Sequence, residues 1–499
     1  MILDPTRLSF GALAAENDIQ RGLKDYFIES PSYQRLRDGE RIVALGNRGS
    51  GKTAIFKMIA DHLRGHRTKK ARVIELAPED FSYELLSRTM TPEDRGAWAK
   101  QGAYAAAWKY VIYVLAMKDL ASSGVSLKTG PAKRIYHYLR DNHDTFPVNP
   151  IGALISYLKR LESIKVGPFE AGIKARELQK LYRLEEIGTL LDDLNTLAGR
   201  NGVTVLVDEL DRGWDASEDA KAFVAGLFQA ATTIQARTPN VRVLVSLRRE
   251  LYESIPALYD DAQKVRDWIE VIEWNEPELL KLVARRIAHS FRELGRRDDN
   301  DLWNLAFGET LDYRQTKSFN YLVDRTLYRP REIIQLCQAA VDAVIAEAAG
   351  LPATYRIIGE AEHQYSEARC KDIAAEYRFQ YPGLGSVFES FRGKSYSFER
   401  EELEVQCLGI LMGDYRVDPA AKDWCSTMEP DDLIEVLWRI GFLQAQAVGG
   451  MKARRRSGSE YLGSHQVSSL NLRNAPRFHV HPMFRAFLGL KEPKRTRED

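Results

Sequence analysis

Short apolar runs alternate with longer segments of helical periodicity in the first half of the chain. The predicted strands cover residues 42–45, 71–76, 203–207, 241–246 and 268–274. A helix with one apolar stripe is predicted over 54–62, and another over 17–28, ahead of the first strand. Strands that alternate with helices predict a parallel sheet covered on both faces.

Helical periodicity dominates the middle of the chain. An aromatic-rich helix is predicted over about 95–120. A β-hairpin is predicted at 163–175, where apolar and polar residues alternate around Gly167-Pro168. These features predict a mainly helical insertion over about 95–185, within an α/β core that spans 1–280.

The last part of the chain shows a different pattern. Helices continue to about residue 349, and residues 348–352 mark a boundary. After it come further helices, the last of them at 430–440, and then two strands separated by a glycine- and arginine-rich loop. This order is typical of a winged helix, so we expect a helical lid at 281–350 and a winged-helix domain at 351–499.

Composition narrows the protein class. The 499 residues are 44% hydrophobic and 28% charged, which is typical of a globular protein rather than a disordered one. The net charge of +1 does not indicate nucleic-acid or membrane binding by the whole chain. The four cysteines are far apart, with no C-x-x-C pair, which argues against a zinc ribbon or a disulfide framework. With no signal peptide and no apolar stretch long enough to span a bilayer, we expect a cytoplasmic protein without a membrane segment.

One glycine-rich loop carries specific chemistry. The residues Gly46-Asn47-Arg48-Gly49-Ser50-Gly51-Lys52-Thr53 fit G-x-x-x-x-G-K-[ST], between a predicted strand and a helix that continues through Ala54. Backbone N–H groups of such a loop and the helix dipole bind phosphate. Lys52 is expected to reach the β- and γ-phosphates, and Thr53 to ligate Mg²⁺. A chance match is the alternative, and the strand before and the helix after the loop argue against it.

Polar residues at the ends of two later strands could complete a hydrolytic site. Asp208 and Glu209 follow the strand at 203–207, where Asp208 suits the Mg²⁺ ligand and Glu209 the base that activates water. Ser246 ends the next strand, and Arg248 follows it. Ser246 could contact the attacking water, and Arg248 could stabilise transition-state charge. The alternatives are an exposed acidic turn and a pair of surface arginines.

Two further basic features leave more than one interpretation open. Arg331 opens a predicted helix and could report the nucleotide state, or it could be solvated charge at the helix start. The loop between the last two predicted strands carries four basic residues, namely Lys452, Arg454, Arg455 and Arg456. These residues could lie on the phosphates of duplex DNA, or they could belong to a solvated loop or a protein contact.

Taken in order, these segments resemble a known group of proteins. The matching stretches are "LGNRGSGKTAI", "VTVLVDELDRGWD", "VRVLVSLRRELYESI", "IEWNEPELLKLVARRI" and "LYRPREIIQLCQAA". Together they resemble bacterial P-loop ATPases of the STAND and KAP-like branch, which are related to AAA+ and origin-recognition ATPases. The resemblance implies that Lys52 and Thr53 contact phosphate and Mg²⁺, that Asp208 and Glu209 serve metal binding and hydrolysis, and that Arg331 senses the nucleotide.

The resemblance also implies a role in bacterial stress response or anti-phage defence, although neither a sensor repeat array nor an effector motif is apparent. We therefore expect a Mg²⁺-dependent ATPase that acts as a nucleotide-driven switch, as a homo-oligomer or with a separately encoded effector. The first alternative is a DNA-binding initiator or loader. The second is a scaffold that holds nucleotide without hydrolysing it. ATP is preferred over GTP because no guanine-reading motif is apparent.

Overall fold

A computed structural model describes residues 3–65, 72–76, 97–122, 130–142, 187–199, 202–211, 214–258, 266–447, 461–467 and 469–492. The chain divides into two compact units. The first, which we call the sheet unit, is Glu29–Ile272. The second, which we call the helical unit, joins Met1–Ile28 to Glu273–Asp499. The predicted hairpin at 163–175 and the four basic residues between 452 and 456 lie outside the described residues.

The sheet unit contains a five-stranded parallel sheet in the order β2-β3-β4-β1-β5. Its strands are β1 (Val43–Gly46), β2 (Arg72–Leu76), β3 (Val203–Val207), β4 (Val241–Arg248) and β5 (Ile269–Val271). The predicted parallel sheet is confirmed, with β4 between the glycine-rich strand β1 and the acidic strand β3. Because every neighbour is parallel, the carboxyl ends of all five strands lie at one edge.

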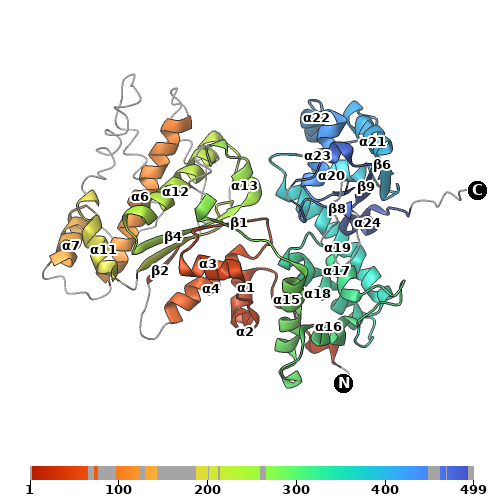
Figure 1. The fold of residues 1–499 in the computed structure, drawn as a ribbon, viewed down its shortest axis with the longest axis horizontal. Coiled ribbons are helices and arrows are strands. Elements are labelled where there is room, and N and C mark those ends of the chain that lie inside the picture. Colours follow the sequence, from red (N-terminus) through yellow and green to blue (C-terminus); the bar gives the residue numbers. More distant parts are fainter. Residues whose placement is uncertain are drawn as a thin grey trace, which may run out of the picture. The chain divides into compact units, whose positions relative to one another are not determined.

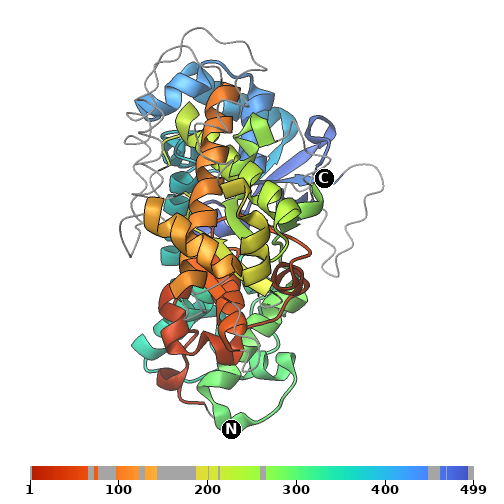
Figure 2. The ribbon, with the colours of Figure 1, turned by 90° about the vertical axis from the view of Figure 1, so that its left-hand side faces the viewer.

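Helices cover both faces of this sheet. Figure 1 shows α6 and α12 on one face and α3 and α4 on the other. In Figure 2 the orange α6 and α7 lie toward the viewer. The helices of the unit are α3 (Pro31–Asp38), α4 (Lys52–Gly65), α6 (Ala97–Ser122), α7 (Gly130–Asn142), α11 (Leu191–Ala198), α12 (Glu218–Arg237) and α13 (Arg249–Glu253).

Helices α6 and α12 cross at very short range. A Cβ atom on Gly226 of α12 would lie 2.7 Å from the backbone nitrogen of Ala105 and 2.7 Å from the Cβ of Tyr104. Beside this point, the Phe223 ring packs against those of Tyr104 and Trp108, with centroids 5.5 and 5.0 Å apart. Only a residue without a side chain fits the crossing.

Replacing Gly226 by alanine is therefore expected to destabilise the protein by about 1–3 kcal/mol, through overpacking. The expected loss of stability is opposite to the effect of intrinsic helix propensity, which favours alanine over glycine by about 1 kcal/mol. The matched control is Gly359→Ala in α19 (Tyr355–Glu376), where no described atom lies within 4 Å of an added Cβ and the propensity gain should appear. Thermal unfolding of both variants measures the difference. A stabilised Gly226→Ala variant would mean that the helices separate freely.

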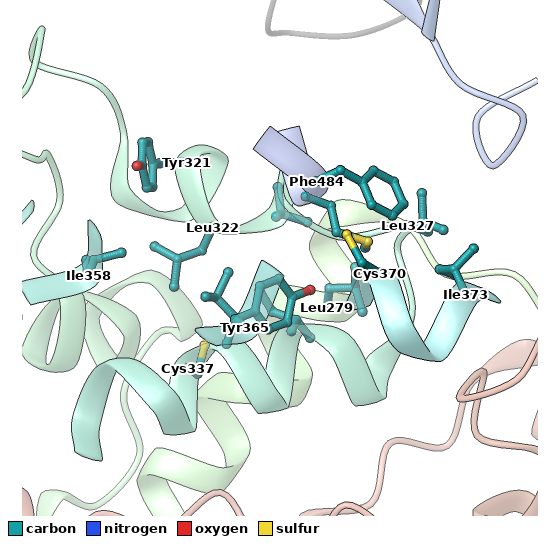
Figure 3. Close-up of a cluster of buried hydrophobic side chains, with 14 of the residues drawn as sticks. Leu279, Tyr321, Leu322, Leu327, Cys337, Ile358, Tyr365, Cys370, Ile373 and Phe484 are labelled. Carbon is teal, nitrogen blue, oxygen red and sulfur yellow. The ribbon is translucent and has the colours of Figure 1, made fainter. Parts of the chain in front are cut away.

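The helical unit is built around one apolar core. Its first helices after the sheet unit are α15 (Glu276–Ser290), α16 (Asp299–Phe307), α17 (Ser318–Val323), α18 (Pro330–Ala346) and α19 (Tyr355–Glu376). Figure 3 shows part of the core, where Leu279, Cys337 and Tyr365 come from α15, α18 and α19. Phe484 of the last helix joins the same cluster. The predicted lid helices and the last part of the chain therefore share one core.

The last part of the helical unit combines helices with a small antiparallel sheet, and three helices separate the first strand of this sheet from its other strands in sequence. The helices are α20 (Leu384–Glu389), α21 (Arg400–Met412), α22 (Pro419–Cys425), α23 (Pro430–Arg439) and α24 (Pro482–Leu488). The strands are β6 (Ser397–Glu399), β7 (Leu443–Gln446), β8 (Tyr461–Leu462) and β9 (Arg477–Val480), in the order β6-β9-β7-β8. Assignment of this region as a winged helix, and of the preceding helices as a lid, stays a prediction.

The prediction of a single helix over 17–28 is wrong. The segment forms α1 (Ala15–Asp18), a 3-10 turn and α2 (Leu23–Tyr26), with a break at Gly22, where φ is 103°. The break brings the Tyr26 hydroxyl to the buried Asp18 carboxylate at 2.7 Å, and Arg286 of α15 pairs with the same carboxylate at 3.1 Å. A tertiary ion pair thus overrides the amphipathic pattern.

No described helix is both long and apolar enough to cross a membrane.

Candidate nucleotide-binding site

The glycine-rich loop leaves β1 at the carboxyl edge of the sheet. Gly49 and Gly51 have φ values of 81° and 95°, a left-handed conformation that side chains disfavour. At Gly46 a Cβ would lie 2.6 Å from the Ser50 hydroxyl oxygen, so the loop folds tightly on itself. The loop conformation therefore explains why glycine occupies these three positions.

The loop ends at the amino terminus of α4. The first bond of that helix runs from the Ile55 N–H to the Gly51 carbonyl, at 3.0 Å. The N–H groups of residues 52–54, including Ala54, precede that bond and have no carbonyl of their own helix to bind. Together with the helix dipole, these groups favour an anion at the loop. No acidic residue lies in the first turn of α4 to oppose it.

Lys52 is folded back into the loop. Its Nζ donates to the carbonyl oxygens of Gly46 at 2.7 Å and Asn47 at 3.0 Å. Burial lowers the pKa of Lys52 to about 8, and this effect is partly opposed by the carboxylates of Glu250 and Asp208. The ammonium group is thus held at the centre of the loop, with acidic groups near it.

The affinity for nucleotide is expected to fall as the pH rises above about 8, the pKa of Lys52 in the free protein. A bound phosphate favours the charged ammonium and raises the pKa of Lys52. Between the pKa of the free protein and the pKa of the complex, nucleotide binding is therefore accompanied by uptake of a proton. The dissociation constant should rise about tenfold per pH unit there. Calorimetric titration with ADP in buffers of different protonation enthalpy measures the proton uptake. A dissociation constant that stays constant to about pH 9 would contradict this assignment.

Asp208 and Glu209 follow β3, as predicted. The Asp208 N–H continues the sheet by donating to the Leu76 carbonyl at 3.0 Å, and the Asp208 Oδ1 accepts from the Glu209 N–H at 2.9 Å. Glu209 has a φ of 61°, which costs free energy in any residue other than glycine. Strained backbone of this kind is a common property of functional sites. Both carboxylates are half-buried at the edge where the loop lies.

The register of β4 places Ser246 and Arg248 beside the loop strand. Ser246 is buried and pairs with Ala44, while Arg248 pairs with Gly46, the first residue of the loop. On the other side of β4, Val245 pairs with Val207, the residue before Asp208. The strand ends thus bring the loop, the acidic pair and Arg248 to one edge of the sheet, while the catalytic roles of Ser246 and Arg248 stay predictions.

Two acidic residues that the sequence interpretation did not assign belong to this edge. Arg248 forms an ion pair with Asp211, and its Nη1 lies 3.6 Å from the Oε1 of Glu250. Glu250 is buried in the first turn of α13, whereas Arg249 pairs with Glu253 at the surface. The position of Glu250 just after a strand end was an available signal, but the run Arg248-Arg249-Glu250 is also typical of solvated surface charge.

Arg331 lies in the helical unit, whereas the glycine-rich loop lies in the sheet unit, far from Arg331 in sequence. Its Nε donates to the Leu13 carbonyl at 3.3 Å. Arg329, two residues earlier, is buried and pairs with Glu376 at 2.7 Å, which accounts for a cation at the start of α18. The sensor role of Arg331 stays a prediction.

The donor set at the loop is suited to Mg²⁺. Thr53 supplies a hydroxyl and Asp208 a carboxylate, the hard oxygen ligands that this ion prefers. Within the described ranges, no group of three or more His, Cys, Asp or Glu side chains is placed to hold a metal by itself. Mg²⁺ usually has few protein ligands, because waters and phosphate oxygens occupy the other positions of its coordination shell.

Comparisons with known proteins find similarity in three places. Residues 277–374 match the family model of the FunZ-associated C-terminal helical domain. The chain is 22% identical over 494 residues to the 80.3 kDa protein assigned to transposon gamma-delta of Escherichia coli (strain K12), covering 96% of this chain and 66% of that protein. The chain therefore spans just under two thirds of that relative's length.

The third similarity is to the solved structure of the ORC2 protein of Aeropyrum pernix in ADPNP and ADP complexes. The identity is 11%, the TM-score is 0.29, and 92% of each chain is covered. A TM-score this low carries no argument about fold, which instead rests on the sheet order and the loop geometry. On those grounds the sheet unit has a P-loop NTPase-like fold, with the glycine-rich loop at the end of β1.

Proposed function

We propose that this protein is a Mg²⁺-dependent ATPase whose hydrolysis cycle changes the arrangement of its two units. The observation that carries the proposal is the convergence at one sheet edge of the loop with Lys52, the Asp208-Glu209 pair and Arg248. A phosphate loop alone binds nucleotide, whereas a second carboxylate beside the metal ligand supplies a base for water.

Each residue has a distinct part in this proposal. The residues from Gly46 to Ala54 cradle the phosphates with backbone N–H groups, and Lys52 exchanges its carbonyl partners for phosphate oxygens. Thr53 and Asp208 would hold Mg²⁺, which would supply positive charge to offset that of the phosphates. Glu209 orients the attacking water and accepts its proton, while Ser246 contacts that water. Arg248 stabilises the charge that develops on the transferred group.

The path of the chain supports coupling between nucleotide and domain arrangement. The chain passes between the units twice, at 28–29 and at 272–273. Ile272, the last residue of the sheet unit, donates its N–H to the Leu45 carbonyl at 2.7 Å, one residue before the loop. A shift of the loop on nucleotide binding would therefore be felt at one connection to the helical unit.

The finer assignments also belong to this proposal. Residues 281–350 act as a lid and 351–499 as a winged-helix domain, with Arg331 reporting the nucleotide state. The switch controls assembly of the chain with itself or with an effector, in a bacterial defence or stress response. The name of the Escherichia coli relative assigns that protein to a transposon. A function connected with mobile DNA is therefore a second biological role in which such a switch could act.

The proposal is tested by phosphate release and small-angle scattering on the full chain. We expect ATP turnover that requires Mg²⁺ and stops when EDTA removes it. We also expect different radii of gyration with AMP-PNP and with ADP. Absence of nucleotide binding would overturn the assignment of the site. Turnover with identical scattering curves would leave an ATPase but refute the switch.

The DNA-binding alternative is not favoured by the described residues. In a winged helix the helix before the wing reads DNA, and here that helix would be α23. Its exposed and half-exposed positions include Asp431, Asp432 and Glu435, and its one exposed arginine, Arg439, pairs with Glu435 at 2.5 Å. An acidic helix face repels the phosphate backbone. Duplex binding that weakens steeply with salt would restore this alternative.

A further inference from the structure

Arg248 is held by two carboxylates at the tip of β4. Its guanidinium forms an ion pair with Asp211 on one nitrogen and lies 3.6 Å from the Oε1 of Glu250 on the other. The strand register fixes this arrangement next to Gly46, where the loop begins. Arg248, whose backbone pairs with the first residue of the phosphate loop, therefore already has anionic partners within the protein.

Glu250 is the more unusual of these two carboxylates. Its side chain is only 6% exposed, compared with 23% for Asp211. A buried carboxylate is costly unless cations compensate it. Among the described residues, Arg248 is one such cation, and Lys52 is another, since Glu250 has the largest effect of any charged group on the pKa of Lys52. The same two cations are the ones that would meet the terminal phosphate of a bound nucleotide.

We propose that Glu250 is a specificity-determining residue, an internal anion that competes with the γ-phosphate of ATP for Arg248. This inference rests on the proposed nucleotide site. To pair with Arg248, a γ-phosphate must draw its guanidinium away from Glu250. The γ-phosphate then lies near the buried Glu250 carboxylate, which has the same sign of charge. A diphosphate has no such group, so with ADP the contact between Arg248 and Glu250 persists. Glu250 thus lowers the affinity for the triphosphate relative to the diphosphate.

The test measures the dissociation constants of AMP-PNP and ADP by calorimetry at neutral pH, with Mg²⁺, for wild type and Glu250→Gln. AMP-PNP should bind on the order of tenfold more tightly to the variant, as expected for removing one like charge at a partly buried site. ADP affinity should change less than about twofold. A merely structural role for Glu250 would weaken both ligands, so a selective gain is the diagnostic result.

Three further variants separate charge from structure. Glu250→Asp keeps the charge and should retain the wild-type ratio of affinities. Asp211→Asn removes the other partner of Arg248 and should shift the ratio in the same direction, which keeps the inference testable if Glu250→Gln folds poorly. Glu253→Gln removes a surface carboxylate from the same helix, where it pairs with Arg249 at 3.0 Å, and should change neither constant.

The possible failures are distinguishable. If the Glu250→Gln variant binds AMP-PNP no more tightly than wild type, or gains equally for both ligands, the competition is refuted while the nucleotide site stands. If the wild-type protein binds neither ligand, the proposed function itself fails.

Discussion

Substitution of Glu209 by glutamine is expected to lower ATP turnover about 10²- to 10⁴-fold, the usual contribution of a general base, with AMP-PNP affinity little changed. Glutamine has nearly the same shape but cannot accept the proton of the attacking water. Phosphate release under single-turnover conditions, together with calorimetric titration of AMP-PNP, measures both quantities. Undiminished turnover would assign the base elsewhere.

A second substitution at the same position separates chemistry from backbone conformation. Glu209 has a φ of 61°, where a residue with a side chain is strained by roughly 1–2 kcal/mol. Glu209→Gly should therefore lose turnover to a similar degree but unfold at an equal or higher temperature than wild type. A large loss of stability in Glu209→Gly would instead indicate that the carboxylate holds the turn together.

Replacing Lys52 by alanine is expected to weaken ATP binding by about 10²-fold or more and to abolish turnover. The ammonium donates to two loop carbonyls, at 2.7 and 3.0 Å, from where it can transfer to phosphate oxygens. Its removal also deletes the charge that offsets the triphosphate. Calorimetric titration with AMP-PNP measures the loss.

The matched control for this change lies one and a half turns along the same helix. Lys57 pairs with Glu75 of β2 at 2.5 Å and does not take part in the loop hydrogen bonds. Lys57→Ala should leave the AMP-PNP affinity within about twofold of wild type, since a half-exposed ion pair contributes about 1 kcal/mol or less to stability. If both lysine variants lose binding equally, the effect is a general loss of fold rather than of the site.

Much of the nucleotide site is predictable from short stretches of sequence. The loop from Gly46 to Thr53 contains its own stereochemical signal, since two of its glycines adopt left-handed conformations. Asp208 and Glu209 directly follow an apolar strand, and parallel strands deliver such residues to one edge. The prediction of a parallel sheet is confirmed, and β4 lies between the strands that carry these two features.

Other features could not be predicted because they depend on residues far apart in the chain. The break in the predicted helix at 17–28 follows from the pairing of Asp18 with Arg286, 268 positions away. Gly226 is required only because α6 crosses α12 at that point. In the same way, periodicity does not reveal that residues 1–28 join the unit formed by 273–499.

The phosphate loop, the acidic pair and the parallel strands that support them follow from short stretches of sequence. Loop stereochemistry and hydrophobic periodicity are short-range properties, so a few neighbouring residues suffice to specify them. Which charged side chains pair with one another depends instead on the folded arrangement of the chain. It set Arg248 opposite Gly46, paired Arg249 outward with Glu253, and buried Glu250 beside Arg248. In the sequence, Arg248, Arg249 and Glu250 form one run of charged residues with no sign of different roles. They differ in the structure because burial and strand register give each residue different partners.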